Sequence, residues 1–312
     1  MSRGIPSPLA AIKLRQIARR IEPDIVHAWL YHGNICSLAL RDICQNILWS
    51  IHNTNLSREK SKRMTRLINR ACATLSSHIP RHVVYASTQA RTVHEELGYD
   101  RRKGILISNG VDLEKFQFNP QARQRIRSSL GLQTDEAAVG CIARFDPQKD
   151  HQTVIRSFAK VIAKKNARLV LAGTGCDTNN EHLQAWLNRE GLQANALLLG
   201  ERRDIADLLC ALDVLVIGSA YGEAMPVIAL EAAAVGLPIV TTNVGDVAPF
   251  TLEPTDIVAP RQPDQMAASI LRILERINTQ TFSDLKAARH KMLKSYYGIS
   301  EMVQKYYNLY VA

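Results

Sequence analysis

The apolar positions of this chain fall into short runs that alternate with stretches of helical spacing. In the second part the runs are Ala138–Ile142, Arg168–Ala172, Ala196–Leu199, Val214–Ile217, Pro238–Thr241 and Asp256–Val258. Helical patterns lie between them, near 151–163, 181–189, 203–211, 225–235 and 263–275. Buried runs of this length, joined by helices, predict parallel strands in βαβ units. Residues 119–280 are therefore expected to form a complete doubly wound parallel-sheet domain.

The first part, residues 1–118, alternates in the same way but offers fewer strands. Its runs are Asp24–His27, Ile47–Ile51, Val83–Tyr85 and Ile105–Ile107, with helices near 10–21, 33–44, 61–76 and 87–97. Only four strands after an opening helix predict an incomplete domain with an unpaired sheet edge. Residues 281–312 are predicted to be helical and to pack back toward this domain through a face of Met292, Tyr296, Tyr297, Met302, Tyr306 and Tyr307.

Composition narrows the class of protein. None of the 312 residues belongs to an apolar stretch long enough for a membrane span, and the N-terminus lacks the apolar core of a signal peptide. The six cysteines are scattered without CxxC spacing, which predicts free thiols in a reducing compartment. We expect a cytoplasmic protein.

The net charge of +10 is concentrated in the first part. Residues 1–120 hold 18 Lys and Arg against 9 Asp and Glu. The densest piece, 58–70, predicts a basic amphipathic helix that is either a solvated face or a contact to anionic lipid or a phosphate-bearing acceptor. This allows a peripheral position on the inner face of the cytoplasmic membrane. We expect no nucleic-acid partner, because no nucleic-acid motif is present and aromatic residues are few.

Two carboxylates are the most informative candidates for chemistry. Glu223 lies in the turn after the strand Val214–Ile217, and Glu231 follows after seven intervening residues, on the predicted helix. The carboxyl end of a parallel strand is where open α/β sheets bind ligands, and carboxylates accept hydrogen bonds from sugar hydroxyls. The alternative for each residue alone is a solvated glutamate.

Three other loops follow predicted strands. Arg144 and Lys149 precede a helix, and a cation pair at a helix N-terminus suits a diphosphate. Gly173 allows a close backbone approach to a nucleotide, and the loop at Arg202 can meet a base. The alternatives are solvated cations, a plain turn and, for Asp204, a helix cap.

Three histidines, His27, His32 and His52, lie near strand ends of the first part. One of them is a candidate general base for an acceptor hydroxyl, and the alternative is a hydrogen-bonded structural role. The chain has no HExxH, GxSxG or P-loop motif and no clustered carboxylates. We therefore expect no metal site.

Taken together, these pieces resemble glycosyltransferase family 4, the retaining nucleotide-sugar transferases with the GT-B fold of two Rossmann-like domains. The matching segments run in the family's order: Pro23–His27, Ser108–Asp112, Ala143–Asp150, Leu171–Gly175, Leu199–Asp204 and Glu223–Val240. Three features depart from the family. Ala224-Met225 stands where Gly-Phe is usual, Trp29 stands where some members carry a histidine, and the opening strands with their glycine-rich loop are missing.

The resemblance implies a role for each matching residue. Arg144 and Lys149 would hold the donor diphosphate, Glu223 the sugar hydroxyls, the backbone of Ala224, Met225, Pro226 and Val227 the sugar and phosphate, Glu231 the ribose, and the backbone of Arg202 the base. No metal or cofactor is implied. The acceptor would be a hydroxyl of a lipid-linked molecule or a polysaccharide, in bacterial envelope polysaccharide synthesis.

Two alternatives remain beside the transferase. One is a truncated nucleotide-sugar-binding domain with weak catalysis, and the other is a GT-B nucleotide-sugar epimerase. The spacing of Glu223 and Glu231 and the Arg144–Lys149 loop argue against the epimerase.

Overall fold

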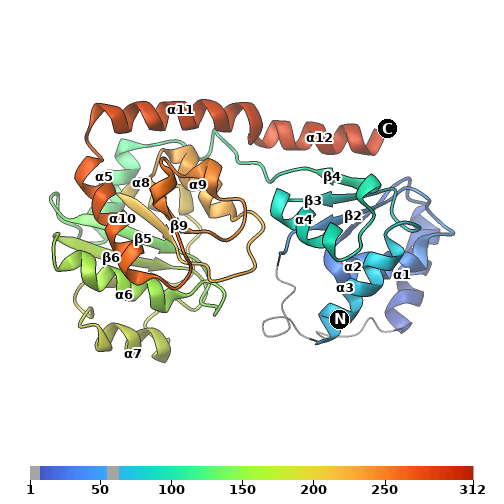
Figure 1. Cartoon of the computed structure of the whole chain (residues 1–312), viewed down its shortest axis with the longest axis horizontal. Coiled ribbons are helices and arrows are strands. Elements are labelled where there is room, and N and C mark those ends of the chain that lie inside the picture. Colours follow the sequence, from blue (N-terminus) through green and yellow to red (C-terminus); the bar gives the residue numbers. More distant parts are fainter. Residues whose placement is uncertain (1–7, 55–62, 312) are drawn as a thin grey trace. The chain divides into compact units, whose positions relative to one another are not determined.

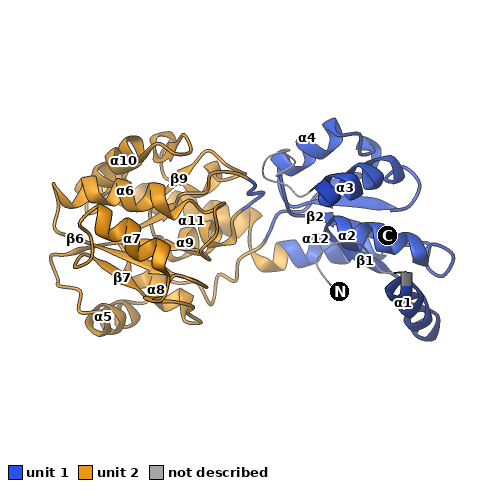
Figure 2. Cartoon of the chain, turned by 90° about the horizontal axis from the view of Figure 1, so that it is seen from below, with its two compact units in different colours: residues 1–109, 222–225, 302–312 blue, residues 110–221, 226–301 orange. Residues whose placement is uncertain are grey.

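The computed structural model describes residues 8–54 and 63–311. The chain divides into two compact units (Figures 1 and 2). Unit 1 comprises 1–109, 222–225 and 302–312, and unit 2 comprises 110–221 and 226–301. Residues 58–62 of the predicted basic helix lie outside the described residues. None of the described helices is long and apolar enough to cross a membrane.

Unit 2 is a doubly wound α/β domain. Its elements are α5 (Pro120–Ser129), β5 (Ala137–Ile142), α6 (His151–Ile162), β6 (Ala167–Ala172), α7 (Glu181–Arg189), β7 (Ala196–Leu198), α8 (Ile205–Ala211), β8 (Val214–Ile217), α9 (Val227–Val235), β9 (Ile239–Thr242), β10 (Ile257–Val258), α10 (Pro263–Arg276) and α11 (Gln280–Tyr296). All strand pairs are parallel, in the order β10-β9-β8-β5-β6-β7. The order reverses between β5 and β8, and such a switch point opens the ligand crevice of this architecture.

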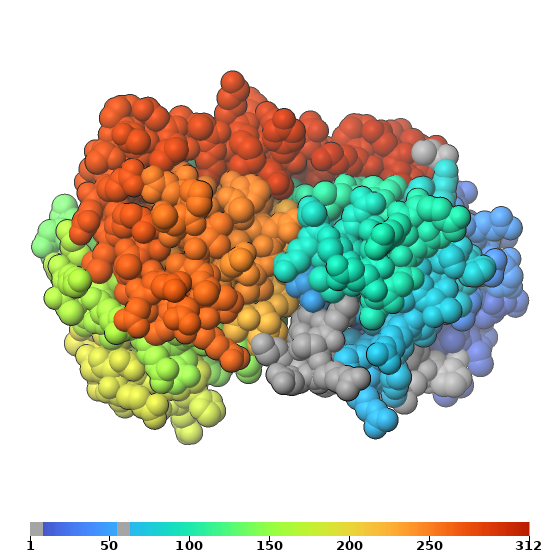
Figure 3. All heavy atoms as spheres, viewed as in Figure 1, coloured from blue at the N-terminus to red at the C-terminus, as the bar shows by residue number. Residues whose placement is uncertain are grey.

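The core of unit 2 follows from the period-two pattern of its strands. Val139 and Cys141 of β5 point into the same apolar layer as Phe158 of α6 and Ile270 of α10, and all four are buried. Helices α6, α7 and α10 cover this face of the sheet. Side chains of α10 and α11 form part of the surface of unit 2 seen in Figure 3.

Unit 1 contains a four-stranded parallel sheet in the order β1-β2-β3-β4. Its elements are α1 (Pro8–Ile21), β1 (Val26–Trp29), α2 (Leu30–Ser37), β2 (Ile47–Ile51), α3 (Arg63–Leu75), β3 (His82–Tyr85), α4 (Thr88–Glu96), β4 (Gly104–Leu106) and the last part of α12 (Ile299–Val311). Residues of α2, α3 and α4 pack on one face of the sheet. Leu309 of α12 packs on the other, against Leu48, Val84 and Ile107. Both faces of the sheet are thus buried, as parallel sheets require.

The structure differs from the sequence predictions in local details. The helix expected near 33–44 begins earlier and is α2 followed by a 3-10 turn at Leu38–Leu40. The helical tail is divided into α11 and α12, because Val111 O accepts a hydrogen bond from Ile299 N and Val111 N donates to Tyr297 O, which interrupts the helix at Gly298. Helix α5 was not expected, although Asn119 accepts a hydrogen bond from Ala122 N as its cap.

The predicted packing face of the tail is only partly correct. Met302 and Tyr306 pack on the sheet of unit 1. Tyr296 and Tyr307, by contrast, are 65% and 58% exposed. The six cysteines are free, as expected, and all but the half-buried Cys36 are buried.

Backbone hydrogen bonds join the strand-end loops of unit 2 into a continuous rim, defined here as residues 143–150, 173–176, 200–204 and 218–220. Phe145 N donates to Thr174 O at 2.8 Å, and Gly173 N donates to Gly200 O at 2.7 Å. Ala220 N donates to Gln148 O at 2.8 Å, across the switch point. The rim therefore holds the loops after β5, β6, β7 and β8 in one fixed arrangement.

Gly173 is the tightest point of this rim. A Cβ at this position would lie 2.2 Å from Ala143 O, and the residue has φ +137°. L-residues rarely adopt this backbone conformation. Only glycine therefore satisfies both the conformation and the contact.

The sheet of unit 1 packs against a buried histidine of α4. The Nε2 atom of His94 is 2.8 Å from the Tyr31 hydroxyl, and Nδ1 is 2.7 Å from Ala90 O. Burial lowers the pKa of His94 to about 4. The ring is therefore neutral in the folded protein at neutral pH.

We predict that unit 1 loses stability on acidification. The pKa of His94 in the folded protein lies below its ordinary value of 6.5. The contribution of His94 to the free energy of unfolding is therefore fully present above pH 6.5 and is lost as the pH falls toward about 4. The full loss from one such group is roughly 3 kcal/mol. Urea unfolding across this range should give a shallower pH slope for His94→Gln than for the wild type. The exposed His78 supplies the control, His78→Gln; equal slopes for the two variants would contradict the assignment.

We also predict that Gly173→Ala destabilises unit 2 by roughly 3 kcal/mol or more, since the contact and the backbone conformation are both violated. Gly131→Ala is the matched control, because Gly131 has φ +65° and a methyl group added there would meet no atom within 4 Å. It should cost only about 1 kcal/mol. Chemical denaturation measures the free energy of unfolding of both variants. Equal losses in the two would show that the contact with Ala143 does not contribute to the stability of unit 2.

Candidate active site

The loop between β5 and α6 presents two cations on the rim. The exposed Arg144 reaches Asp146 Oδ2 from Nε at 3.4 Å and Gln148 Oε1 from Nη2 at 3.1 Å. Gln148 N in turn donates to Asp146 Oδ1 at 2.9 Å, and Lys149 N donates to Asp146 O at 2.9 Å. The loop thus orients Arg144 and fixes the backbone of Lys149 before any ligand binds.

Glycine also permits the close packing under Lys149. A Cβ on Gly218, just after β8, would lie 2.6 Å from Val154 Cγ2 and 3.2 Å from Lys149 O. Asp150, at the start of α6, has φ +45° and accepts a hydrogen bond from the Thr153 hydroxyl at 2.7 Å. The chain can therefore pass directly from the Lys149 loop into the helix, whose N-terminus favours anions.

Arg202 lies on the rim after β7. Its Nε donates to Asp204 Oδ1 at 2.8 Å, and its Nη2 donates to Asp204 Oδ2. Asp204 occupies the N-cap position of α8 but makes no side-chain cap hydrogen bond. The expected cap is therefore replaced by an ion pair, which occupies the Arg202 side chain.

Helix α9, which follows β8 in the chain, begins with no side-chain cap. Pro226 is its N-cap residue, Val227 is its first residue, and its first turn holds no acidic side chain. Pro226 has no N–H of its own, and the first N–H groups of a helix lack intrahelical partners. This helix end is suited to an anion.

Glu231 is the one charged residue of α9, whose sequence is otherwise apolar (Val-Ile-Ala-Leu-Glu-Ala-Ala-Ala-Val). Six of its nine residues are buried, as expected for a helix that is apolar all round. Burial raises the pKa of the half-buried Glu231, and Lys115 opposes the rise. A partly desolvated carboxylate of this kind gains from ligand hydroxyl donors.

The segment 222–225 belongs to unit 1. Glu223 is buried, and its backbone carbonyl accepts a hydrogen bond from the Thr54 hydroxyl at 2.7 Å. Met225 O accepts from Asn109 Nδ2 at 3.3 Å. Ala224 packs in the apolar core of unit 1. The Ala224-Met225 pair, which departs from the family's usual Gly-Phe, thus has buried side chains.

The histidines occupy different surroundings. His27 Nδ1 is 2.7 Å from the Tyr310 hydroxyl, and its Nε2 is 2.6 Å from Ser50 Oγ. Burial and, to a lesser extent, the neighbouring His52 lower the pKa of His27 to about 4. Proton transfer through His27 would require one of these two contacts to be given up.

The other two histidines are less constrained. His52 stacks on Trp29 with ring centroids 4.8 Å apart, and its Nε2 atom is buried without a hydrogen-bond partner in the described part of unit 1. His32 is half-buried in the first turn of α2. His27, Trp29 and His52 thus form one aromatic group, whereas His32 lies on a separate helix.

The structure brings the unit 2 candidates Arg144, Lys149, Gly173 and Arg202 onto one rim, with α9 starting beyond β8. The sequence analysis missed three residues that hold the rim in place, Asp146, Gln148 and Gly218. The Asp-Pro pair at 146–147 is a turn signal that could have indicated Asp146.

No group of three or more potential metal ligands occurs within 8–54 and 63–311.

Comparison with known proteins identifies the family. The sequence profile described as "Glycosyltransferase Family 4" matches residues 2–115, and the profile "Glycosyl transferases group 1" matches residues 136–276. Because the first match already begins at residue 2, the shortfall of N-terminal strands stays a prediction.

Two curated relatives illustrate the similarity. The uncharacterized glycosyltransferase MJ1607 of Methanocaldococcus jannaschii is 28% identical over 268 residues, covering 80% of this chain and 66% of that protein. The D-inositol 3-phosphate glycosyltransferase of Mycobacterium tuberculosis is 31% identical over 170 residues, covering 53% of this chain and 34% of that protein. The matched regions thus span just under two thirds of the first relative and about a third of the second.

A solved structure supports the fold. The crystal structure of Anabaena Alr3699/HepE in complex with UDP-glucose superimposes with a TM-score of 0.82 at 21% identity, covering 96% of this chain and 82% of that one. With two parallel sheets of four and six strands, the chain has the GT-B fold. It belongs to the group 1, family 4 glycosyltransferases.

Proposed function

We propose that this chain is a retaining glycosyltransferase that moves a sugar from a nucleotide-diphosphate sugar to an acceptor hydroxyl. Family membership supports the reaction class. The single observation that carries the donor assignment is Glu231, the lone carboxylate on the apolar helix α9, half-buried and with a raised pKa. A charge held there needs hydrogen-bond donors, and the vicinal hydroxyls of a ribose supply two.

The diphosphate is assigned to Arg144, Lys149 and the N-terminus of α9. A planar guanidinium, an ammonium and uncapped backbone N–H groups are complementary to phosphate oxygens. These groups would also stabilise the charge that develops on the departing nucleotide. The related structure with UDP-glucose makes UDP the first nucleotide to test.

The remaining donor contacts follow the family resemblance. Glu223 is assigned to the sugar hydroxyls, and the backbone of Ala224, Met225, Pro226 and Val227 to the sugar and phosphate. The backbone at Arg202 is assigned to the base, which agrees with the engagement of its side chain by Asp204. Gly173 lets the rim approach the nucleotide.

On the acceptor side we propose His32 or His27 as the group that accepts the proton of the attacking hydroxyl. The half-buried position of His32 at the start of α2 favours it. The contacts of His27 to Ser50 and Tyr310 favour a positioning role for that ring.

The proposed acceptor is a lipid-linked molecule or a polysaccharide, with bacterial envelope polysaccharide synthesis as the setting. The basic first part supports this, because it suits an anionic membrane surface or a phosphate-bearing acceptor. On α3, Met64 and Leu67 are exposed between the exposed Arg63 and Arg70. Apolar and cationic side chains on one helix surface are typical of binding at a membrane interface.

A second candidate is a nucleotide-sugar-binding chain with little turnover. The apolar exposure of α1 favours it, since Leu9, Ile12, Ile17 and Ile21 are 47–70% exposed, and β1 pairs with β2 alone in the described sheet. Such a surface is suited to contact with a further polypeptide. Turnover of UDP-glucose by the wild type separates the candidates, because only the first requires it.

We predict that Glu231→Ala weakens UDP binding about 10- to 100-fold, the loss expected when hydrogen bonds to a charged group are removed. A thermal-shift titration measures this, because a ligand that binds only the native state raises its stability. Glu275→Ala on the exposed surface of α10 is the matched control and should bind like the wild type. Equal UDP affinity of the Glu231 variant and the control would remove the ribose assignment.

We predict that the chain sediments with phosphatidylglycerol vesicles but not with phosphatidylcholine vesicles, and that added salt releases it. Charge reversal at Arg63 and Arg70 should weaken binding by at least about tenfold, given about 1 kcal/mol per basic residue. Reversal of Arg189 and Lys164, which are exposed in unit 2, is the control. Equal binding to both kinds of vesicle, or an equal loss of binding when Arg189 and Lys164 are reversed, would contradict a membrane role for α3.

A further inference from the structure

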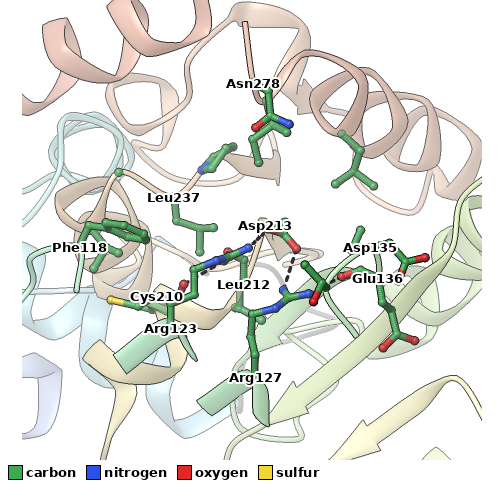
Figure 4. Close-up of a pocket in the computed structure, with 18 of the residues that line it drawn as sticks. Phe118, Arg123, Arg127, Asp135, Glu136, Cys210, Leu212, Asp213, Leu237 and Asn278 are labelled. Atoms are coloured by element: carbon green, nitrogen blue, oxygen red, sulfur yellow. Dashed lines mark hydrogen bonds and ion pairs between the residues drawn. The ribbon is translucent and has the colours of Figure 1, made fainter. Parts of the chain in front are cut away.

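Unit 2 contains a cavity of about 670 Å³ away from the rim (Figure 4). It is lined by Ala137 at the start of β5, by Asp213 just before β8, and by Pro238 just before β9. These positions mark the amino ends of the strands, whereas the rim lies at their carboxyl ends. The cavity is therefore not the proposed donor site.

Two arginines of α5 form one wall of the cavity (Figure 4). Arg123 Nη2 donates to Asp213 Oδ1 at 2.6 Å, and Arg127 Nη1 donates to Asp213 Oδ2 at 3.2 Å. Asp213 Oδ2 also accepts from Ala138 N at 2.7 Å. The two guanidiniums thus share a single carboxylate.

The two arginines also donate to backbone carbonyls. Arg123 Nη1 donates to the carbonyls of Cys210 and Leu212 and Arg127 Nη1 to that of Ala211, all near the end of α8, and Arg127 Nη2 donates to the carbonyls of Gln133 and Glu136. Both arginines are therefore rigid parts of the wall. Preorganised cations of this kind lose little entropy when an anion binds.

The wall carries a surplus of positive charge. The cations are Arg123, Arg127, Lys165 and Lys286, and the carboxylates are Asp135, Glu136 and Asp213. Glu136 is already ion-paired, at 3.1 Å, with Arg168, which is not part of the lining. Two positive charges around the cavity are thus left without a carboxylate.

Lys286 of α11 is the adaptable member of this set. It is half-buried, and no ion pair is found for it in the parts of the chain that the structure describes; its Nζ lies 5.3 Å from the centre of the Phe282 ring. Burial lowers the pKa of Lys286, and the charges of Arg289 and Arg123 add to this effect. A bound anion would offset both the burial of the Lys286 ammonium and its repulsion by the two arginines.

Apolar side chains complete the lining. Leu209, Leu212 and Leu237 are buried, and Leu274 and Ile277 are partly buried. A cavity with an apolar wall and a few convergent charges is the usual form of a small-molecule site. The two kinds of wall together predict a ligand with an anionic group and an apolar body.

We propose that this cavity binds a small organic phosphate, with its phosphate near Lys286 and Arg123 and its apolar part against Leu212 and Leu237. A phosphate monoester carries a charge of about −1.5 to −2 at neutral pH, which matches the surplus of two. This site is independent of the donor site and does not rest on the proposed transferase function.

The experiment is a calorimetric titration of the full chain with phenyl phosphate and with inorganic phosphate, at neutral pH and at an ionic strength held constant with sodium chloride. Both should bind saturably, and phenyl phosphate should bind more tightly because of its ring. Lys286→Met should weaken the affinity for phenyl phosphate at least about tenfold, because a charge-assisted hydrogen bond is lost. Lys286→Arg should retain binding, which separates loss of charge from loss of fold.

Lys291→Met is the matched control, since it removes an exposed lysine of the same helix, α11, that does not line the cavity, and it should leave phenyl phosphate binding unchanged. Four results would overturn the proposal: no saturable binding of either probe, equal binding of the two probes, full binding by a folded Lys286→Met protein, or loss of binding in Lys291→Met.

Discussion

The close approach of Gly173 to Ala143 is the contact on which the rim of unit 2 depends. With no Cβ at 173, the loops after β5 and β6 lie in backbone contact, and Gly173 N reaches the loop after β7 at Gly200. The Gln148–Ala220 hydrogen bond then extends the rim across the switch point to the loop after β8. The four loops are thereby held in place by their own backbone contacts. If the proposed donor binds there, it need not organise them.

Charged groups of unit 2 gather at both ends of its strands. At the carboxyl ends, Arg144 is oriented by Asp146 and Gln148, and α9 begins without a side-chain cap. At the amino ends, Arg123 and Arg127 neutralise carbonyls near the end of α8, where the helix dipole is negative. The surplus of positive charge around Lys286 is additional to these structural contacts. Unit 2 thus holds cations at the carboxyl ends and at the amino ends of its strands, and different contacts fix them in place.

Local signals made much of this fold predictable, whereas features that depend on distant residues were not. The strand β8 and the helix α7 begin and end where the apolar pattern placed them, and Glu231 stands out in the sequence as a lone carboxylate on an apolar helix. The break in the tail, by contrast, arises from the distant Val111. The ion pair of Arg202 removes Asp204 from its expected cap, because a cationic fork at close range competes with a backbone N–H. The cavity is formed by α5, α11 and the strand starts, which are remote from one another in sequence.

Donor binding by the rim and the start of α9 is best tested by amide hydrogen exchange with and without UDP-glucose, because exchange reports backbone N–H groups segment by segment. We expect slowed exchange in residues 143–150, 173–176 and 200–204 and in the first turn of α9. Saturating UDP-glucose that leaves these segments unchanged, or that protects only the segments around Lys286, would show that the nucleotide sugar does not bind at the rim.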